Sequence, residues 1–213
     1  MKKRRSPLPP DTRRAQLLDA ATLVFARKGY RAASISDIIA RAGVARGTFY
    51  LYFASKQAVF LAIVEAFHGR VRQELGAAEA APAGPDAGPK QILEAGFGRW
   101  LRFFAGHREA TTVILREASS IDPRFEKGFA DLRQTAVAHF AERYRRLQSA
   151  GLVRRTVSPE LLAHLLLGMF DELLNAFVLP DPAADVDLLA RQLADFEWNG
   201  LRPEATGRET PES

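Results

Sequence analysis

The sequence predicts an all-α protein of about nine helices, with a small N-terminal domain followed by a larger helical domain. Two observations predict this fold. Apolar residues recur every three to four positions in one segment after another, and no stretch alternates between apolar and polar residues as a half-buried strand would. Prolines and glycines separate the periodic segments. At 213 residues, of which 47% are apolar and 26% charged, the chain is long enough for a sizeable core.

The N-terminus begins with a basic arm and a first helix. Residues 1–10 combine four consecutive cations, Lys2 to Arg5, with three prolines, so we expect a disordered arm. Such an arm can lie along phosphates, although a solvated tail explains the same composition. The first helix is predicted to begin at Asp11 or Thr12 and to end at Gly29, with Leu18, Ala21 and Phe25 as its apolar stripe.

The segment SISDIIARAGVARGTFYLYFASK, residues 34–56, predicts two short helices joined by a tight turn and followed at once by another helix. Ser34 is the candidate N-cap, and Gly43 provides the backbone freedom that the turn requires. On the second short helix we expect an inner side of Ala45, Phe49 and Tyr52 or Phe53, and an outer side of Arg46, Gly47, Tyr50 and Leu51. This is the layout of a helix-turn-helix DNA reader.

A fourth helix follows, and a loop separates it from the rest of the chain. Ser55 can cap this helix, which is predicted to run to about Leu75. Residues 76–89 are rich in Ala, Gly and Pro, which indicates a flexible loop.

The domain boundaries follow from these elements. We expect a disordered arm at 1–10, the reader at 11–56 with the helix 55–75 as a connection, a loop at 76–89, a second domain at 90–200 and a disordered tail at 201–213. The second domain is helical in period over 90–106, 107–118, 123–150, 158–178 and 185–199.

Charge and composition limit the classes of function. Residues 1–56 contain 12 Lys and Arg against 3 Asp and Glu, whereas residues 57–213 contain 18 against 22. A basic N-terminal segment followed by an acidic one is expected when the N-terminal part binds a polyanion. A basic tail and chance could give the same distribution of charge. The absence of cysteine excludes disulfides and thiolate metal sites, so we expect a reducing, cytoplasmic location and no metal.

Neither export nor a membrane span is expected. The start, MKKRRSPLPP, lacks the apolar run of a signal peptide. The most apolar stretch, residues 161–179, is interrupted by His164, Asp171, Glu172 and Asn175.

Residues 12–67 resemble the TetR/AcrR family of bacterial one-component transcription regulators. The resemblance rests on LLDAATLVFARKGY and on SISDIIARAGVARGTFYLYFASKQAVF, with its glycine-valine turn, its T-F-Y-x-Y-F run and the lysine just inside the fourth helix. It implies that double-stranded DNA is the partner, that the second domain is all-helical, and that the protein is a homodimer.

The resemblance also implies the DNA contacts. Arg46, Gly47, Thr48 and Tyr50 are expected over base edges, and Ser34, Ser36, Tyr52 and Lys56 on phosphates. The chemistry agrees, because Arg46 can donate two hydrogen bonds to guanine and Thr48 can offer a methyl group to thymine. A phosphate near Lys56 would also meet the amide groups of a helix N-terminus.

Simpler interpretations of the same residues stay open. Ser34 and Ser36 could only cap and solvate their helix, Tyr50 or Tyr52 could be a packing aromatic, and Lys56 could be a surface lysine. Leu51 is left without a role.

The second domain supplies candidates for a small-molecule site. Apolar cavities in helical bundles carry few polar anchors, so we expect a hydrophobic effector and take the ligand-binding residues to be Phe97, Trp100, Phe104, His139, Phe140, Arg143, Asp171 and Asn175. A buried carboxylate at Asp171 would need a partner, namely the ligand, an arginine such as Arg116, or the other subunit. Arg99, Arg102 and Arg116 make a fatty-acyl conjugate one candidate effector.

The helix 158–178 has more apolar positions than one packed face uses, so it should be buried on two sides. In the family this helix and the last one form a two-fold four-helix interface. The dimer residues are accordingly predicted to be Leu162, Leu166, Phe170, Leu173 and Phe177.

Together these observations predict a homodimeric, ligand-responsive regulator, most simply a repressor released from a palindromic operator, without cofactor, metal or catalytic residues. Two alternatives remain. One is an architectural or adaptor protein that binds DNA without an effector. The other is a helical enzyme acting on an anionic substrate, for which the sequence offers no phosphate loop, metal spacing or nucleophile motif.

Overall fold

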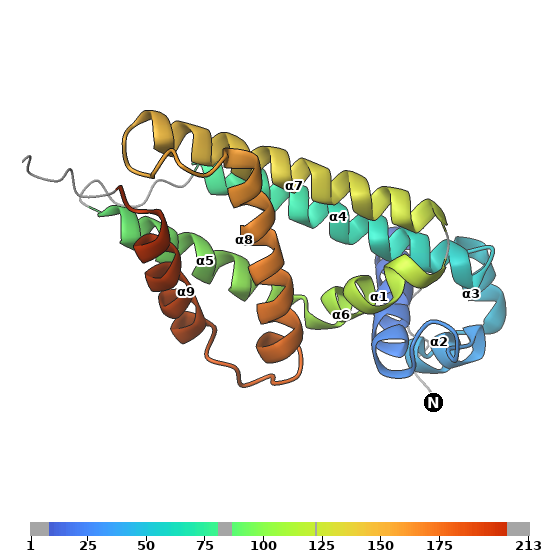
Figure 1. Ribbon diagram of the computed structural model, residues 1–213. Helices are drawn as coiled ribbons and strands as arrows, with labels where there is room; N and C mark the ends of the chain where they lie inside the picture. Colours follow the sequence, from blue (N-terminus) through green and yellow to red (C-terminus); the bar gives the residue numbers. More distant parts are fainter. Residues whose placement is uncertain (1–8, 81–86, 122, 204–213) are drawn as a thin grey trace, which may run out of the picture. The chain divides into compact units, whose positions relative to one another are not determined.

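The computed structural model describes residues 9–80, 87–121 and 123–203 (Figure 1). The prediction of an all-α fold is confirmed: this part of the chain forms nine α-helices and one π-helix and contains no strand. The elements are α1 Pro10–Lys28, α2 Ile35–Ala42, α3 Arg46–Tyr52, α4 Lys56–Ala80, α5 Pro89–Gly106, α6 Arg108–Ile121, α7 Pro123–Ser149, α8 Pro159–Leu173, η1 Leu174–Val178 and α9 Val186–Leu201.

The first helix forms for the reasons expected. Proline in its first turn has a φ already suited to a helix, and its lost N–H is one that a helix start leaves unbonded. Of the predicted stripe, Ala21 and Phe25 are fully or almost fully buried, whereas Leu18 is half-buried and the neighbouring Leu17 is fully buried in its place. The helix ends at Gly29, whose φ of 76° is favourable for glycine alone.

Helix α4 is longer than predicted. It begins at Lys56, and the Ser55 hydroxyl accepts a hydrogen bond of 3.0 Å from the amide of Ala58, as expected for a cap. It continues to Ala80, so residues 76–80 belong to a helix and not to the predicted loop. Alanine has the highest helix propensity, and the alanines after Gly76 offset the cost of that glycine. Of the rest of the predicted loop, residues 81–86 lie outside the described residues.

The chain divides into two compact units, and the division differs from the predicted one. The first unit contains the chain up to Glu74 together with His107–Ala130, and the second contains Leu75–Gly106 and the chain from Asp131 onward. Helix α6 therefore belongs with the reader, where it packs against α1 and buries Thr111, Val113 and Ile114. Periodicity shows that a segment is helical but does not show which helix it packs against.

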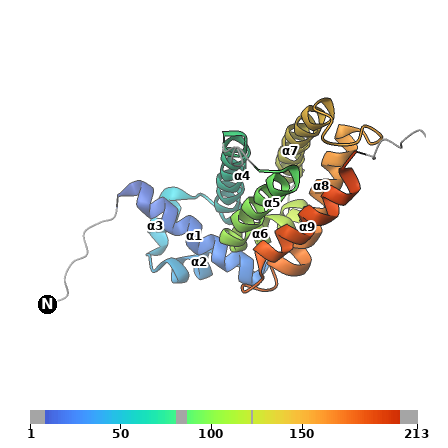
Figure 2. The same cartoon turned by 90° about the vertical axis from the view of Figure 1, so that its left-hand side faces the viewer.

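The second unit is built around α5 and α9, which lie side by side in both ribbon views (Figures 1 and 2). Two ion pairs connect them on the surface: Lys90 with Asp195 at 2.5 Å, and Arg102 with Asp187. Inside, the Tyr144 hydroxyl of α7 donates a hydrogen bond to the Glu197 carboxylate of α9, and both side chains are buried. Burial raises the pKa of Glu197 and also that of Tyr144.

Helix α8 and the π-helix η1 form the apolar segment that the sequence places at 158–178. The Ser158 hydroxyl caps α8 through the amide of Leu161, at 3.3 Å. By length and composition Pro159–Val178 is apolar enough to cross a membrane, with 33% of its most apolar window buried, and the bent pair Arg46–Tyr52 and Lys56–Ala77 passes the same test. Helices that pack into a protein core or an interface have the same composition.

Candidate DNA interface and effector site

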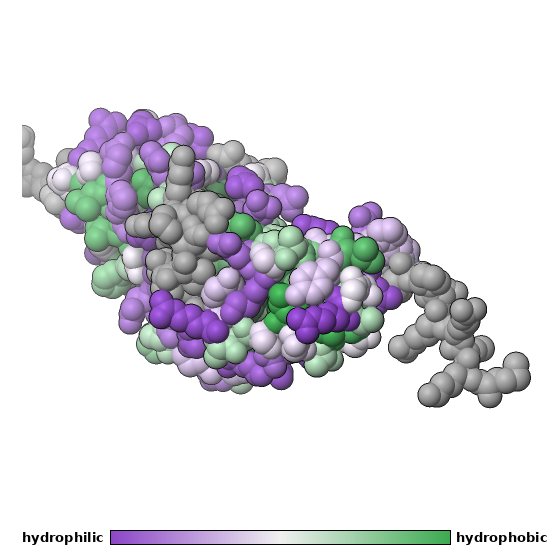
Figure 3. Space-filling view, turned by 90° about the vertical axis from the view of Figure 1, so that its right-hand side faces the viewer, coloured by the Kyte–Doolittle hydropathy of each residue, from purple (hydrophilic) through white to green (hydrophobic). Residues whose placement is uncertain are grey.

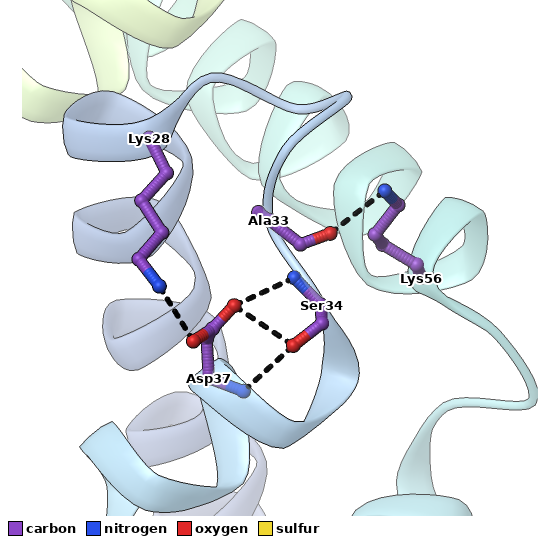
Figure 4. A network of polar contacts seen from close by, with 5 residues as sticks. All are labelled: Lys28, Ala33, Ser34, Asp37 and Lys56. Atoms are coloured by element: carbon purple, nitrogen blue, oxygen red, sulfur yellow. Dashed lines mark hydrogen bonds and ion pairs between the residues drawn. The ribbon is translucent and has the colours of Figure 1, made fainter.

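A network of polar contacts fixes the start of α2 (Figure 4). The Ser34 hydroxyl accepts from the amide of Asp37 at 3.1 Å, and the Asp37 carboxylate accepts from the amide of Ser34 at 2.9 Å. The two side chains also contact each other at 2.8 Å, and Lys28 of α1 pairs with Asp37 at 2.6 Å. The hydrogen bond from Lys28, followed by those from Ser34, lowers the pKa of Asp37 to about 2. Ser34 thus acts as the predicted cap, completed as a capping box by Asp37.

The turn between α2 and α3 has the predicted form. Gly43 has a φ of 66°, in the left-handed region, and its amide donates to the carbonyl of Ile39 at 2.9 Å. The side-chain amide of Gln16 in α1 donates to the carbonyl of Ala42 at 2.8 Å and so holds the end of α2. Sequence reasoning missed Gln16, because a side chain 26 residues away that binds a backbone carbonyl leaves no periodic pattern.

Helix α3 separates an inner from an outer side. Phe49 is fully buried and Phe53 almost so, and their ring centroids are 5.9 Å apart. On the other side, Tyr50 is 45% exposed and Leu51 is 82% exposed. The Arg46 guanidinium lies 6.0 Å from the centroid of the Tyr50 ring, so the cation and the phenol share the outer side.

The other residues predicted to contact DNA are exposed to solvent to different degrees. Ser36 and Gly47 are exposed, whereas Thr48 and Tyr52 are half-buried. Ala45 is a correction to the expected inner side: it is the exposed N-cap residue of α3, because the helix begins one residue later. A β-carbon added to Gly47 would meet no atom within 4 Å, so packing inside the protein does not require glycine there.

In the space-filling view of Figure 3, hydrophilic and hydrophobic residues lie side by side on the surface turned toward the viewer. A DNA groove offers this combination of partners, with phosphates and base edges for polar groups and thymine methyl groups for apolar ones.

Residues 17–63 match the family model of the bacterial regulatory proteins of the tetR family. Over 163 residues the chain is 30% identical to the HTH-type transcriptional repressor Rv1474c of Mycobacterium tuberculosis, a match that covers 76% of this chain and 80% of that repressor. The chain belongs to the TetR family. It is therefore a DNA-binding transcriptional regulator and not an enzyme, as the sequence predicted.

Two further relatives of the TetR-family chain cover most of its length. The fatty acid metabolism regulator protein of Bacillus subtilis is 24% identical over 195 residues, which are 87% of this chain and 94% of that protein. The structure of FadR from Bacillus halodurans, a fatty acid degradation regulator, has the same fold with a TM-score of 0.74, at 23% identity over 92% of this chain and 99% of that one. Other matches are partial: the chain spans 36% of the regulator YerO of Bacillus subtilis.

In the second unit of this TetR-family chain, aromatic rings gather around Trp100. The ring centroid of Trp100 lies 5.8 Å from that of Phe104 and 6.3 Å from that of Phe140, and Phe97 contacts Phe170 at 5.6 Å. His139 stacks edge-on against Phe140 at 5.2 Å. Four of the predicted ligand residues, Trp100, Phe104, His139 and Phe140, are thus brought together by α5 and α7, whereas Phe97 of α5 meets Phe170 of α8.

The polar anchors predicted for a ligand have other partners. Asp171 is only half-buried and pairs with Arg133 at 2.7 Å, so its partner is an intrachain arginine but not Arg116. Asn175 is exposed, and its amide donates to the carbonyl of Asp171 at 2.9 Å. The expectation of a buried carboxylate at Asp171 is therefore corrected.

An apolar cavity of about 70 Å³ lies between α5, α7 and α9. Among the predicted ligand residues, Arg143 lines it, together with Leu93, Tyr144 and Trp198. Arg143 also lies against Gly96, where an added β-carbon would stand 3.6 Å from the guanidinium.

The predicted dimer face needs correction. Leu162, Leu166 and Phe170 are buried within the protomer, so they have almost no surface left for a partner. The exposed large apolar side chains of this region are Leu161, Leu165, Phe177, Leu188 and Phe196. Of the predicted five, Phe177 is exposed and Leu173 is half-buried. Apolar positions on both sides of a helix do not show which side is buried within the protomer and which side is left for a partner.

Proposed function

We propose that the protein is a homodimeric repressor that binds a palindromic operator in the cytoplasm and leaves it when a hydrophobic effector enters the second unit. The observation that carries the DNA-binding part is the outer side of α3, where Arg46, Tyr50 and Leu51 project from a helix whose inner side is buried. Arg46 suits guanine, Gly47 allows close approach to the groove, and the apolar Leu51 suits a thymine methyl group. Ser36 and Tyr52 are proposed phosphate contacts.

The proposed dimer brings two readers to one operator. Exposed apolar side chains occur on α8 (Leu161 and Leu165), on η1 (Phe177) and on α9 (Leu188 and Phe196), and a second copy would cover them in the proposed dimer. A two-fold axis through such a surface places the readers on successive major-groove faces, about 34 Å apart or a multiple of that distance. The operator would then be palindromic.

The proposed effector is largely hydrophobic, because the interior of the second unit is aromatic around Trp100 and the neighbouring cavity is apolar. A relative is a fatty acid metabolism regulator, which agrees with an acyl chain. Two of the three arginines that suggest an anionic head group have partners within the chain: Arg102 pairs with Asp187, and Arg99 donates to the carbonyl of Ala77 at 3.0 Å. The effector class therefore rests on the apolar lining.

The response would pass through α4, whose residues contribute to both units. Coupling between an effector and DNA of this kind is typically about 1 to 3 kcal/mol, or roughly 5- to 150-fold in affinity. The competing function is DNA binding without an effector, and the mutual contacts of the rings around Trp100 favour it, since rings that fill their own space leave little for a ligand.

One experiment tests both parts of the proposal. The preferred duplex is selected from a random pool, and its affinity is measured for the natural protein and for Arg46→Ala, with and without a series of fatty acids. We expect Arg46→Ala to weaken the selected site by about 1 to 3 kcal/mol and random duplex far less. Equal losses on both duplexes would contradict base reading by Arg46, and unchanged affinity with every fatty acid would favour the effector-free function.

A further inference from the structure

Lys56, the first residue of α4, directs its side chain into the protein. Its Nζ donates to the carbonyl oxygen of Ala33 at 2.8 Å (Figure 4). It also donates to the carbonyl of Tyr30 at 2.8 Å, with the carbonyl of Arg31 at 3.4 Å, and lies 4.4 Å from the centroid of the Tyr30 ring. An ammonium group has three N–H donors, and these three carbonyls account for all of them.

The segment that Lys56 binds is itself firmly packed. The ring of Tyr30 lies 5.4 Å from that of Phe25 in α1 and 4.9 Å from that of Phe60 in α4. The amide of Ala33 donates to the carbonyl of Gly29 at 3.2 Å, which closes the turn after α1. The carbonyls of this segment therefore converge on one point, and Lys56 occupies it.

We propose that Lys56 is a positioning residue that holds the segment 30–33 against α4, and that it does not bind a DNA phosphate. The segment leads directly into Ser34, the cap of α2. The start of α2 is thus held from α1 through Lys28 and Asp37, and from α4 through Lys56. The first turn of α4 and the entrance to the reader move together as a result.

The alternative is the phosphate contact that the family resemblance implies for this lysine. A phosphate would have to take the donor that now meets the Arg31 carbonyl at 3.4 Å, or draw Nζ away from the two carbonyls at 2.8 Å, which would leave half-buried acceptors without their donor. The positioning role needs no such rearrangement. Its consequence for DNA rests on the proposed function, but its consequence for stability does not.

Lys56→Met tests the inference, because it keeps an unbranched side chain and removes the donors. Arg31→Met is the matched control, since it removes one positive charge from the exposed side chain of the same segment. We expect Lys56→Met to lower the thermal unfolding midpoint by about 4 to 8 °C. The slope of log affinity against log salt should match that of Arg31→Met. A Lys56→Met protein with an unchanged midpoint, and a slope shallower than the control's by about 0.9, would show a phosphate contact and overturn the inference.

Lys56→Arg keeps the test decisive if the methionine variant folds poorly. Guanidinium binds phosphate at least as well as ammonium, so a phosphate contact would survive the change. A guanidinium is larger than an ammonium and spreads its donors within one plane, so it fits poorly at the point where Nζ meets the three carbonyls, and a positioning role predicts a lower midpoint with a normal salt slope. A parental midpoint for Lys56→Arg would overturn the inference. If no duplex is bound by the natural protein, the proposed function fails, while the midpoints still decide the role of Lys56.

Discussion

The reader and the second unit are held together by different means. In the reader, short helices are fixed by single polar contacts at their ends, as with Ser34 and Asp37 at the start of α2 and Gln16 at its end. In the second unit, long helices are held by aromatic side chains around Trp100 and by ion pairs across α5 and α9. The reader also has a buried aromatic interior, since Phe25, Phe49 and Phe60 are fully or almost fully buried, so the difference lies in the polar contacts that fix the ends of its short helix α2.

This difference sets what each unit can do. Contacts at helix ends fix the direction of α3 within narrow limits, as recognition of base edges requires. An aromatic interior tolerates the exchange of one apolar side chain for another of similar volume, so the geometry of the second unit is fixed less narrowly. Substitutions that remove a buried aromatic side chain, or a side chain of the reader, separate these two contributions.

The largest effect is expected from Trp100→Ala. The side chain is 7% exposed and central to the aromatic cluster, so its truncation should lower the free energy of unfolding by about 3 to 5 kcal/mol. Denaturant unfolding followed by circular dichroism measures this loss. Under conditions where the variant remains folded, its affinity for the selected duplex should stay close to that of the natural protein. A selective loss of DNA affinity without a loss of stability would contradict the division of roles.

The next effect concerns assembly. Phe177→Glu places a charge on an exposed apolar surface, at a side chain that is 52% exposed. If this surface is the dimer interface, the variant should dissociate with a loss of about 2 to 4 kcal/mol, since each protomer contributes the residue once. Sedimentation over a concentration series measures it. Gln73→Glu, at an exposed position of α4, adds the same charge elsewhere and should leave the dimer intact. Equal behaviour of the two variants would place the interface on another surface.

The same contrast explains how far the sequence could predict the structure. The caps at Ser34 and Ser55, the turn at Gly43 and the inner side formed by Phe49 and Phe53 were predicted correctly, because each depends on neighbours a few residues away. The family resemblance supplied the functional meaning of that local pattern.

The predictions that failed concern contacts between residues far apart in the sequence. The partner of Asp171 is Arg133, 38 residues away, and helix α6, predicted to belong to the second domain, packs against α1 and belongs to the first unit. Leu162 and Leu161 are both leucines on one helix, yet one is buried and the other exposed. Such choices depend on which surfaces meet in the folded chain, and no local spacing records them.

Gly47→Ala should have two smaller effects of opposite sign, one on stability and one on DNA affinity. No atom lies within 4 Å of the added β-carbon, so the substitution should raise the free energy of unfolding by up to about 1 kcal/mol through helix propensity. At the groove floor the same methyl group should weaken DNA binding. Chemical denaturation and duplex titration of one preparation measure the two signs. A stabilised protein with unchanged DNA affinity would remove Gly47 from the interface.

The smallest effect should come from protonation of Asp37. Its pKa falls from 3.8 to about 2 on folding, chiefly through the hydrogen bond from Lys28, so the ionised carboxylate stabilises the folded state. A group with a depressed folded pKa contributes its full stabilisation above the unfolded value and loses it as the pH falls through the folded value. The unfolding midpoint should therefore decline between pH 3.8 and about pH 2 more steeply in the natural protein than in Asp37→Asn. The position is exposed enough that salt should screen part of this difference. Parallel declines in both proteins at low salt would mean that the capping network in the reader contributes nothing through its charge, and that only its hydrogen-bond geometry matters.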